Sequence, residues 1–324
     1  MASGFWISQA VYVAAHIKLA DHLGAELRTA ASIAAATGMH ASSLHRLMRA
    51  LTAVGILAQQ DGDRFTLTRL GESLKIGAEG SARSAVLYIA SQSQWQAWGD
   101  FLYSMQTGEP AFDKVLNVTQ FEYLAAHPEE AAHFGETMVG FHGAEPAAVT
   151  AAYDFSALRT LVDVGGGTGN LITTILSANP HLSGRLFDMP HAASDGRARI
   201  ERLGLSSRCE FVTGDFFENV PSGADAYLLS HVIHDWNEAR CLTILSNCRR
   251  ALNPSSKVLL IEMVLPAGNE PHPGKMLDLQ MLATTGGQER TPQEYANLLA
   301  KASLQLTRVL PTASAVSIVE AVPA

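Results

Sequence analysis

The stretch Leu161–Gly169 reads LVDVGGGTG and decides the fold of the C-terminal half of the chain. Apolar and β-branched residues lead to a single carboxylate, Asp163, and a glycine cluster separates this run from the helical segment Leu171–Leu176. The pattern predicts a buried parallel strand, a tight turn and a helix start, where a ligand can lie against bare backbone N–H groups. A glycine loop alone is weak evidence, because many doubly wound folds have one without this use.

Acidic residues follow the next two predicted strands. Asp188 ends the second strand, 19 residues after Gly169, which is close to the spacing of about 20 at which an acid meets a ribose hydroxyl. Asp215 and Phe216 follow the third strand, where a carboxylate can accept from an adenine amine and a ring can stack on the purine. A single acid of this kind is an ordinary turn residue, but three at successive strand ends indicate a ligand site.

These acids distinguish between nucleotide-like ligands. No basic residue stands beside the glycines in the sequence to meet a pyrophosphate, and Asp163 would repel a phosphate but attract an ammonium group. The predicted ligand is therefore an adenosine with an amino-acid tail, S-adenosylmethionine, rather than NAD. The candidate cofactor-binding residues are Asp163, Gly165, Gly167, Asp188, Gly214, Asp215 and Phe216.

Composition limits the class of protein. A chain of 324 residues is long enough for two domains, and with 47% hydrophobic and 17% charged residues it can bury a sizeable core. The net charge of −8 argues against a nucleic-acid or anionic-membrane binder. The cysteines are odd in number and widely spaced, which predicts buried reduced thiols; they are Cys209, Cys241 and Cys248. Without a signal peptide or a spanning apolar run, we expect a cytoplasmic protein.

The N-terminal third has the pattern of a winged helix. A helical run covers Phe5–Leu23, a short helix lies within Thr29–Gly38, a second begins near Ala41, and Asp61-Gly62 joins two short strands, Ile56–Gln59 and Arg64–Leu67. One interpretation is DNA binding, and the other is a dimerisation module whose apolar first helix packs against a second copy. We favour dimerisation, because DNA affinity depends on phosphate neutralisation and this chain is acidic.

Strands and helices alternate after residue 160, which predicts a mainly parallel sheet with helices on both faces. The segment between the winged helix and this sheet is predicted to be helical, with its last helix over Pro128–Val149. We therefore divide the chain into residues 1–90, 91–155 and 156–324. The predicted strands are Leu161–Val164, Arg185–Asp188, Cys209–Thr213, Ala226–Ser230 and Lys257–Val264, followed by a closing hairpin of Leu304–Leu310 and Ala315–Ala321.

A family is recognisable from the fourth strand onward. His234-Asp235-Trp236 follows that strand, and with the glycine loop, Asp188, Asp215-Phe216 and the run Gly286–Thr291 it resembles the plant caffeate and bacterial hydroxyneurosporene type of small-molecule O-methyltransferases. The resemblance covers nearly the whole chain and is nearest to bacterial members that methylate aromatic antibiotic intermediates. It implies a Rossmann-like catalytic domain with a seven-stranded sheet, preceded by a winged-helix domain that forms a homodimer.

The resemblance also implies catalytic roles. His234 matches the general base that takes the proton of a substrate hydroxyl, for which an imidazole is suited because its pKa lies near the operating pH. Glu262 and Glu289 match the acids that orient this histidine, and Asp235 beside it contacts substrate or backbone. In-line methyl transfer would leave S-adenosylhomocysteine as the product, and no metal is needed. The cluster of His231, His234 and Asp235 could hold a metal, but no further ligand motif supports one.

Two features depart from the family pattern or remain open. Ser230 stands where many relatives have lysine, although its main-chain carbonyl could still meet the amino group of the cofactor. Phe141 stands where many plant members have a histidine in the substrate-lining helix, which makes the predicted pocket more apolar. The candidate substrate-lining residues are Trp98, Met138, Phe141 and Met281, and helix core is an equally good interpretation for each.

We therefore predict an S-adenosylmethionine-dependent O-methyltransferase that acts on a phenolic or other hydroxyl of a small aromatic molecule. One alternative keeps the fold but changes the chemistry to C- or N-methylation, hydroxylation, decarboxylation or cyclisation. The presence of His234 with Glu262 and Glu289 argues against it. The other alternative is a ligand-sensing transcription regulator that uses the winged helix.

Overall fold

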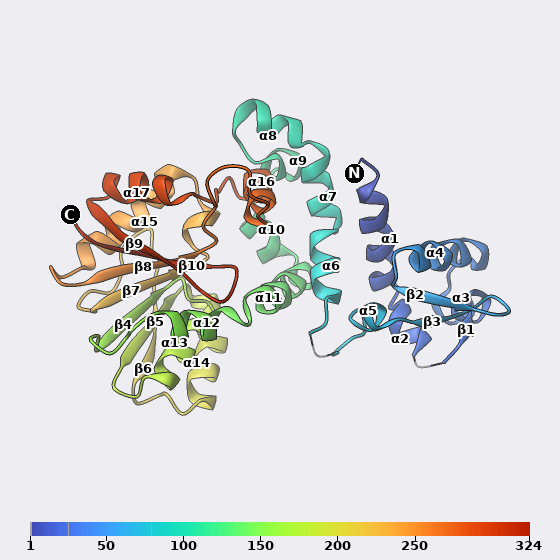
Figure 1. Cartoon of the computed structure of the whole chain (residues 1–324), viewed down its shortest axis with the longest axis horizontal. Coiled ribbons are helices and arrows are strands. Elements are labelled where there is room, and N and C mark those ends of the chain that lie inside the picture. The colour runs from blue at the N-terminus through green and yellow to red at the C-terminus, as the bar shows by residue number, and fades with distance from the viewer. Residues whose placement is uncertain (1, 25, 79) are drawn as a thin grey trace. The chain divides into compact units, whose positions relative to one another are not determined.

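The computed structural model describes residues 2–24, 26–78 and 80–324, which form two compact units (Figure 1). Unit 1 contains Met1–Asp100 and Val115–Gly143, and unit 2 contains Phe101–Lys114 and Ala144–Ala324. Each unit has its own buried hydrophobic core. The division at residues 90 and 155 rests on sequence motifs and stays a prediction.

Unit 1 contains the predicted helix, turn, helix and hairpin. Helix α3 begins after Thr29, whose side chain accepts from the Ser32 N–H at 3.2 Å, and it ends at Gly38 with a φ of 70°. Strands β2 and β3 pair antiparallel, and a short strand β1, which the sequence did not predict, adds to β3. The bounds are β1 Arg28–Thr29, α3 Ala30–Thr37, α4 Ala41–Ala53, β2 Leu57–Gln60 and β3 Arg64–Leu67.

Two helices predicted as continuous are broken. The run from Phe5 divides into α1 and α2 because Lys18 takes a left-handed conformation, with a φ of 55°, that a helix cannot continue through. The run from Pro128 divides into α11 and α12 because Pro146 has no N–H with which to continue the ladder. The bounds are α1 Gly4–His16, α2 Leu19–Leu23, α11 Pro128–His142 and α12 Glu145–Ala152.

Other short helices lie on both sides of the unit boundaries. Unit 1 contains α5, α6, α7 and α10, and unit 2 contains α8, while α9 crosses from one unit to the other. Their bounds are α5 Arg69–Glu72, α6 Arg83–Ile89, α7 Gln92–Gly99, α8 Phe101–Thr107, α9 Ala111–Leu116 and α10 Gln120–Ala126. In the described part of the chain, no helix is both long and apolar enough to cross a membrane.

Unit 2 is built on a seven-stranded sheet in the order β6-β5-β4-β7-β8-β10-β9, and this confirms the predicted fold class. The first five of these strands run parallel, and the C-terminal hairpin adds β10 antiparallel to β8. Strands β6 and β7 have the predicted bounds. The bounds are β4 Thr160–Val164, β5 Ser183–Asp188, β6 Cys209–Thr213, β7 Ala226–Ser230, β8 Lys257–Glu262, β9 Leu304–Pro311 and β10 Ser317–Pro323.

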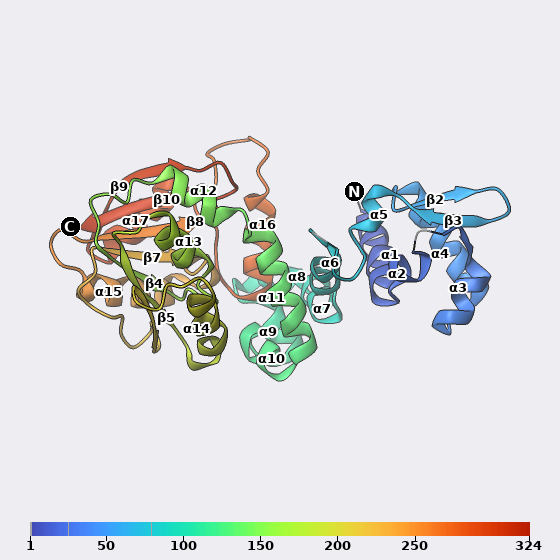
Figure 2. The same cartoon turned by 90° about the horizontal axis from the view of Figure 1, so that it is seen from below.

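Helices cover both faces of this sheet (Figure 2). One core joins α12, α13 and α14 to the sheet, and the other joins α15 and α17 to its opposite face, as expected for strands that are apolar on both sides. All three cysteines are buried and free, as predicted. The bounds are α13 Asn170–Ala178, α14 Ala193–Arg202, α15 Glu238–Ala251, α16 Gly274–Thr284 and α17 Pro292–Lys301, with short 3₁₀ turns η1 Pro190–Ala192 and η2 Ile233–Asp235.

The parallel strands determine where a ligand site can form. Because β4 to β8 run in one direction, the segments that follow Val164, Asp188, Thr213, Ser230 and Glu262 all emerge at the same edge. The chain order reverses between β4 and β7, and ligands of open α/β sheets bind outside the carboxyl ends of the strands at such a point.

Candidate active site

The glycine loop after β4 is shaped for close approach of a ligand. Gly165 and Gly167 have φ values of 69° and 56°, which side-chain-bearing residues rarely adopt. A Cβ on Gly166 would lie 2.6 Å from the Asp163 carboxyl carbon, so only glycine fits there. Asp188 stabilises the turn, because its Oδ2 accepts from the Gly167 N–H at 2.7 Å.

Asp163 lies beneath this loop and is fully buried. Burial raises the pKa of its carboxyl group to about 7. The Ile172 N–H partly opposes this shift, but among the described residues neither carboxylate oxygen accepts a hydrogen bond of good geometry. An unsatisfied acid under a glycine turn fits a cofactor that carries an ammonium group and does not fit one that carries a phosphate.

The segment after β6 lies against the same loop. A Cβ on Gly165 would be 3.2 Å from the Phe216 ring, so this aromatic side chain borders the glycines. Asp215 holds the turn through its Oδ1, which accepts from the Phe217 N–H at 2.7 Å. Gly214 is required because a Cβ there would be 2.4 Å from the Phe187 ring. The predicted adenine-side residues therefore share one edge with the glycine loop.

The structure also places a cation, Arg199, beside the helix that follows the glycine loop, which the sequence did not predict. Arg199 of α14 donates from Nε to the Thr173 hydroxyl at 3.0 Å, and its Nη2 donates to the Asn170 side chain. Both partners lie in the first turn of α13, directly after the glycine loop. No local pattern could have signalled this contact, because Arg199 is separated from that turn by a strand and a connecting loop.

The backbone around His234 is fixed from two sides. The Ile233 N–H donates to Glu262 Oε1 at 2.9 Å, and the Gln288 N–H donates to the His234 carbonyl at 2.8 Å. Gly287 permits this second contact, since a Cβ there would lie 1.9 Å from the His234 oxygen. The glycine pair before Glu289 thus lets that loop reach the turn that carries His234.

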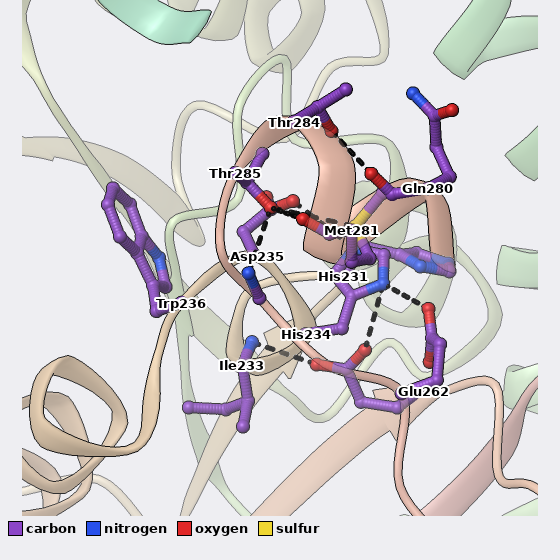
Figure 3. A network of polar contacts seen from close by, with 12 residues as sticks. His231, Ile233, His234, Asp235, Trp236, Glu262, Gln280, Met281, Thr284 and Thr285 are labelled. Carbon is purple, nitrogen blue, oxygen red and sulfur yellow. Dashed lines mark hydrogen bonds and ion pairs between the residues drawn. The ribbon is translucent and has the colours of Figure 1, made fainter. Parts of the chain in front are cut away.

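Three carboxylates surround the His234 imidazole, and Figure 3 labels two of them, Asp235 and Glu262. The Nδ1–H donates to Glu289 Oε1 at 2.6 Å, and Glu262 Oε2 lies 3.9 Å from the same nitrogen. On the other side, Asp235 Oδ1 lies 3.7 Å from Nε2. The structure therefore brings together all four predicted catalytic residues, which arrive from η2, the end of β8 and the loop after α16.

Burial and charge act in opposite directions on this histidine. Burial alone would lower the pKa of His234, but Glu262, Asp235 and Glu289 together raise it to about 10. Burial raises the pKa of Glu262 to about 8, although His234 opposes that shift. Because Nδ1–H is committed to Glu289, Nε2 is the nitrogen that can exchange a proton with a ligand.

A second histidine lies close to this cluster. His231 and His234 have ring centroids 5.2 Å apart, and with Glu262 their ligand atoms lie within 4.8 Å of one another, as a metal site would require. However, His231 Nε2 is 2.8 Å from Glu145, and His234 is hydrogen-bonded to Glu289. These partners fit an acid–base cluster better than a set of metal ligands.

The remaining predicted residues are divided between the two units. Ser230 is the last residue of β7, and Met281 is in α16 beside the catalytic cluster (Figure 3). Trp98, Met138 and Phe141 belong to unit 1, in α7 and α11, so their role as substrate-lining residues stays a prediction. The sequence reasoning missed Asp278 of α16, whose Oδ1 accepts from the Glu289 N–H at 2.9 Å.

Comparison with known families identifies this arrangement. Residues 96–305 match the model of the O-methyltransferase domain, and residues 1–75 match that of the O-methyltransferase dimerisation domain. The chain belongs to the O-methyltransferase family. It is an S-adenosylmethionine-dependent O-methyltransferase, and the winged helix of unit 1 falls within its dimerisation domain.

Several relatives match this methyltransferase over nearly its whole length. It is 42% identical over 323 residues to a phenazine O-methyltransferase of Lysobacter antibioticus, covering 100% of this chain and 94% of that one. It is 39% identical over 312 residues to a 2,7-dihydroxy-5-methyl-1-naphthoate 7-O-methyltransferase of Streptomyces carzinostaticus, covering 96% and 93%. A crystal structure of a neocarzinostatin-pathway O-methyltransferase with S-adenosylmethionine and a hydroxynaphthoic acid superposes with a TM-score of 0.89 at 36% identity, covering 98% and 96%.

Proposed function

We propose that this methyltransferase acts on a phenolic hydroxyl of a small polycyclic or substituted aromatic acceptor, with His234 as its proton acceptor. The observation that carries the proposal is the 2.6 Å hydrogen bond from His234 Nδ1–H to Glu289, which fixes the imidazole with Nε2 as its proton-exchanging nitrogen. The named acceptors of the relatives, phenazine and naphthoate compounds, support an aromatic acceptor.

The acids around His234 determine which protonation states can react. Because they raise the pKa of His234 to about 10, the imidazole of the free enzyme carries its proton at neutral pH. In the reactive complex of enzyme and acceptor, one proton is therefore held either by His234 Nε2 or by the acceptor oxygen. Neutral His234 can take that proton from a phenol, or charged His234 can bind a phenolate that has already lost it. In both routes, Glu289 stabilises the imidazolium that faces the acceptor oxygen.

The cofactor residues are proposed from the same edge of the sheet. Bound S-adenosylmethionine would supply the methyl group on a cationic sulfur. Gly165 and Gly167 would let its amino-acid tail approach the backbone, with Asp163 beneath attracting the ammonium group. The other proposed contacts are Asp188 with the ribose, Gly214, Asp215 and Phe216 with the adenine, and the carbonyl of Ser230 with the amino group.

We also propose that the dimerisation domain makes the enzyme a homodimer through its N-terminal helices, and that it acts in the cytoplasm without nucleic-acid or membrane partners. The matched dimerisation domain supports the first statement. Size-exclusion chromatography with light scattering tests it, because a monomer at micromolar concentration would contradict it. A gel shift at physiological salt tests the alternative role in DNA binding.

The proposed reaction is tested by incubating the enzyme and S-adenosylmethionine with hydroxyphenazines, hydroxynaphthoates and hydroxybenzoates, with arylamines as a parallel set. We expect phenols to gain the mass of one methyl group, with one S-adenosylhomocysteine formed per product. His234→Ala should lower kcat by about 10²–10⁴-fold and leave the cofactor Kd nearly unchanged. Methylation of arylamines alone, a different mass gain, or normal activity in His234→Ala would contradict the proposal.

A further inference from the structure

Arg290 is a buried cation whose contacts centre on the catalytic pair. It is 3% exposed and directly follows Glu289 in the chain. One guanidinium nitrogen, Nη1, donates to the Ile233 carbonyl at 3.2 Å and to the Gln288 carbonyl at 2.9 Å. Ile233 immediately precedes His234, and Gln288 immediately precedes Glu289. Arg290 Nη1 therefore connects the peptide group before His234 with the peptide group before Glu289.

The second guanidinium nitrogen strengthens the same connection through Cys241. Arg290 Nη2 lies 3.6 Å from Cys241 Sγ, and this sulfur lies 3.1 Å from the Ile233 carbonyl and 3.1 Å from the Trp236 carbonyl. Cys241 is fully buried in α15. The turn that carries His234 is thus held at both ends by a cation and a thiol that lie behind it.

The backbone of Arg290 is itself anchored to the sheet. Its carbonyl accepts from the Leu265 N–H at 2.9 Å, and it forms a parallel bridge with Val264, just beyond β8. The guanidinium therefore extends from a fixed point. This anchoring distinguishes it from a flexible surface cation, whose position would not constrain its partners.

We propose that Arg290 is a positioning residue for methyl transfer, which holds His234 and Glu289 at the separation that their hydrogen bond requires. The inference rests on the proposed function, in which His234 exchanges a proton with the acceptor. A planar guanidinium can bond two carbonyls and a sulfur at once, whereas a lysine ammonium is a point charge on a flexible stem. Lysine would keep the charge at this place but lose the fixed geometry.

The 2.6 Å contact between His234 and Glu289 explains why this geometry affects the rate. A displacement of about 1 Å in an active site can cost about 10²-fold, because the reacting groups are no longer aligned. A longer contact also weakens the support that Glu289 gives to the charged imidazole. Loss of the Arg290 contacts should therefore lower kcat and also move the pH dependence of the reaction.

The test compares Arg290→Lys with Arg208→Lys as a matched control. Arg208 also donates to backbone carbonyls, at 2.6 Å to Leu182 and 3.1 Å to Leu176, but it lies at the far end of α13 from the loop after β4. We expect Arg290→Lys to lower kcat about 10- to 100-fold, with the cofactor Kd unchanged by calorimetry and the alkaline limb of kcat/KM moved to lower pH. Arg208→Lys should leave kcat within about twofold and the limb in place, although its Tm falls.

A further pair of variants covers the case in which Arg290→Lys does not fold. Cys241→Ala should lower kcat and move the alkaline limb in the same direction, and Cys241→Ser, which keeps a donor, should restore both. The inference is overturned if the limb stays in place in Arg290→Lys or in Cys241→Ala, or if Arg208→Lys moves it equally. Failure of the wild-type enzyme to methylate any phenol of the panel would instead overturn the proposed function.

Discussion

The two glutamates beside His234 should contribute unequally, and paired substitutions can show it. Glu289 accepts the Nδ1–H at 2.6 Å, whereas Glu262 lies 3.9 Å from that nitrogen and accepts the Ile233 N–H instead. Glu289→Gln and Glu262→Gln are identical chemical changes at buried sites. We expect Glu289→Gln to lower kcat about 10²- to 10³-fold and Glu262→Gln to lower it no more than about 10-fold.

The magnitudes follow from distance and protonation. At an effective dielectric constant of about 20, a unit charge at 2.6 Å contributes about 6 kcal/mol and one at 3.9 Å about 4 kcal/mol before desolvation. Removing one partner of a buried pair costs about 3–4 kcal/mol in practice, which corresponds to about 10²–10³ in rate. Burial also opposes the charge on Glu262 and raises the pKa of its carboxyl group to about 8, so its support of the imidazolium is weaker than the distance alone indicates.

The assay is steady-state methyl transfer to the best phenol of the panel at pH 7.5, with product mass detection and saturating cofactor. Tm values and the cofactor Kd of both variants exclude unfolding as the cause of a rate loss. A Glu262→Gln loss equal to or larger than that of Glu289→Gln would refute the reasoning. So would a Glu289→Gln enzyme with nearly normal kcat, since the shorter hydrogen bond would then not support the base.

Three other predictions concern pH, cofactor binding and stability. Since the acids raise the pKa of His234 to about 10, the pH profile of kcat/KM should be bell-shaped, rising through the pKa of each phenol and falling near pH 10 for every phenol. A rising limb fixed near pH 6.5 for every phenol would contradict this prediction. Asp188→Ala should weaken S-adenosylmethionine binding about 10- to 100-fold by calorimetry, and an unchanged Kd would refute the ribose contact. Burial opposes ionisation of Glu320, but hydrogen bonds led by those of Arg308 and Tyr153 lower the pKa of its carboxyl group to about 2. The ionised carboxylate therefore stabilises the fold above about pH 4.5, and this stabilisation is lost as the pH falls toward 2. Glu320→Gln should therefore cost about 2–4 kcal/mol in chemical denaturation at pH 7 and converge with wild type in acid; a constant difference across pH would exclude this cause.

The sheet could be predicted because its signals are local. Strands β6 and β7 are short apolar runs bounded by turn residues, and their ends follow from the sequence alone. The helix breaks were missed for a physical reason. Lysine rarely adopts the left-handed conformation that Lys18 takes, so no residue type signals the first break. The predicted helix Pro128–Val149 has Pro146 in its interior, where proline is poorly tolerated, and the structure has it in the first turn of α12 instead.

The catalytic cluster could not have been assembled from periodicity or spacing. Glu262 and Glu289 lie 28 and 55 residues after His234, and only the family resemblance connects them. The contacts that hold the cluster in place are even harder to predict from the sequence. Asp278 and Arg290 bond to backbone groups, and such contacts leave no pattern of residue types because any residue supplies the partner.

Arg199 tests the inference that the glycine loop receives an ammonium group rather than a phosphate. Its guanidinium contacts the first turn of α13, and the start of the helix after a glycine loop is where a phosphate would bind. However, it donates to Thr173 and Asn170, while the Gly167 N–H, which a phosphate would need, is already bonded to the Asp188 carboxylate. Asp163 is buried below, so two acids face the loop, and the Arg199 guanidinium is engaged by neighbouring side chains. The local charge therefore favours a cationic tail, because the Asp188 carboxylate already accepts the N–H that a bound phosphate would use.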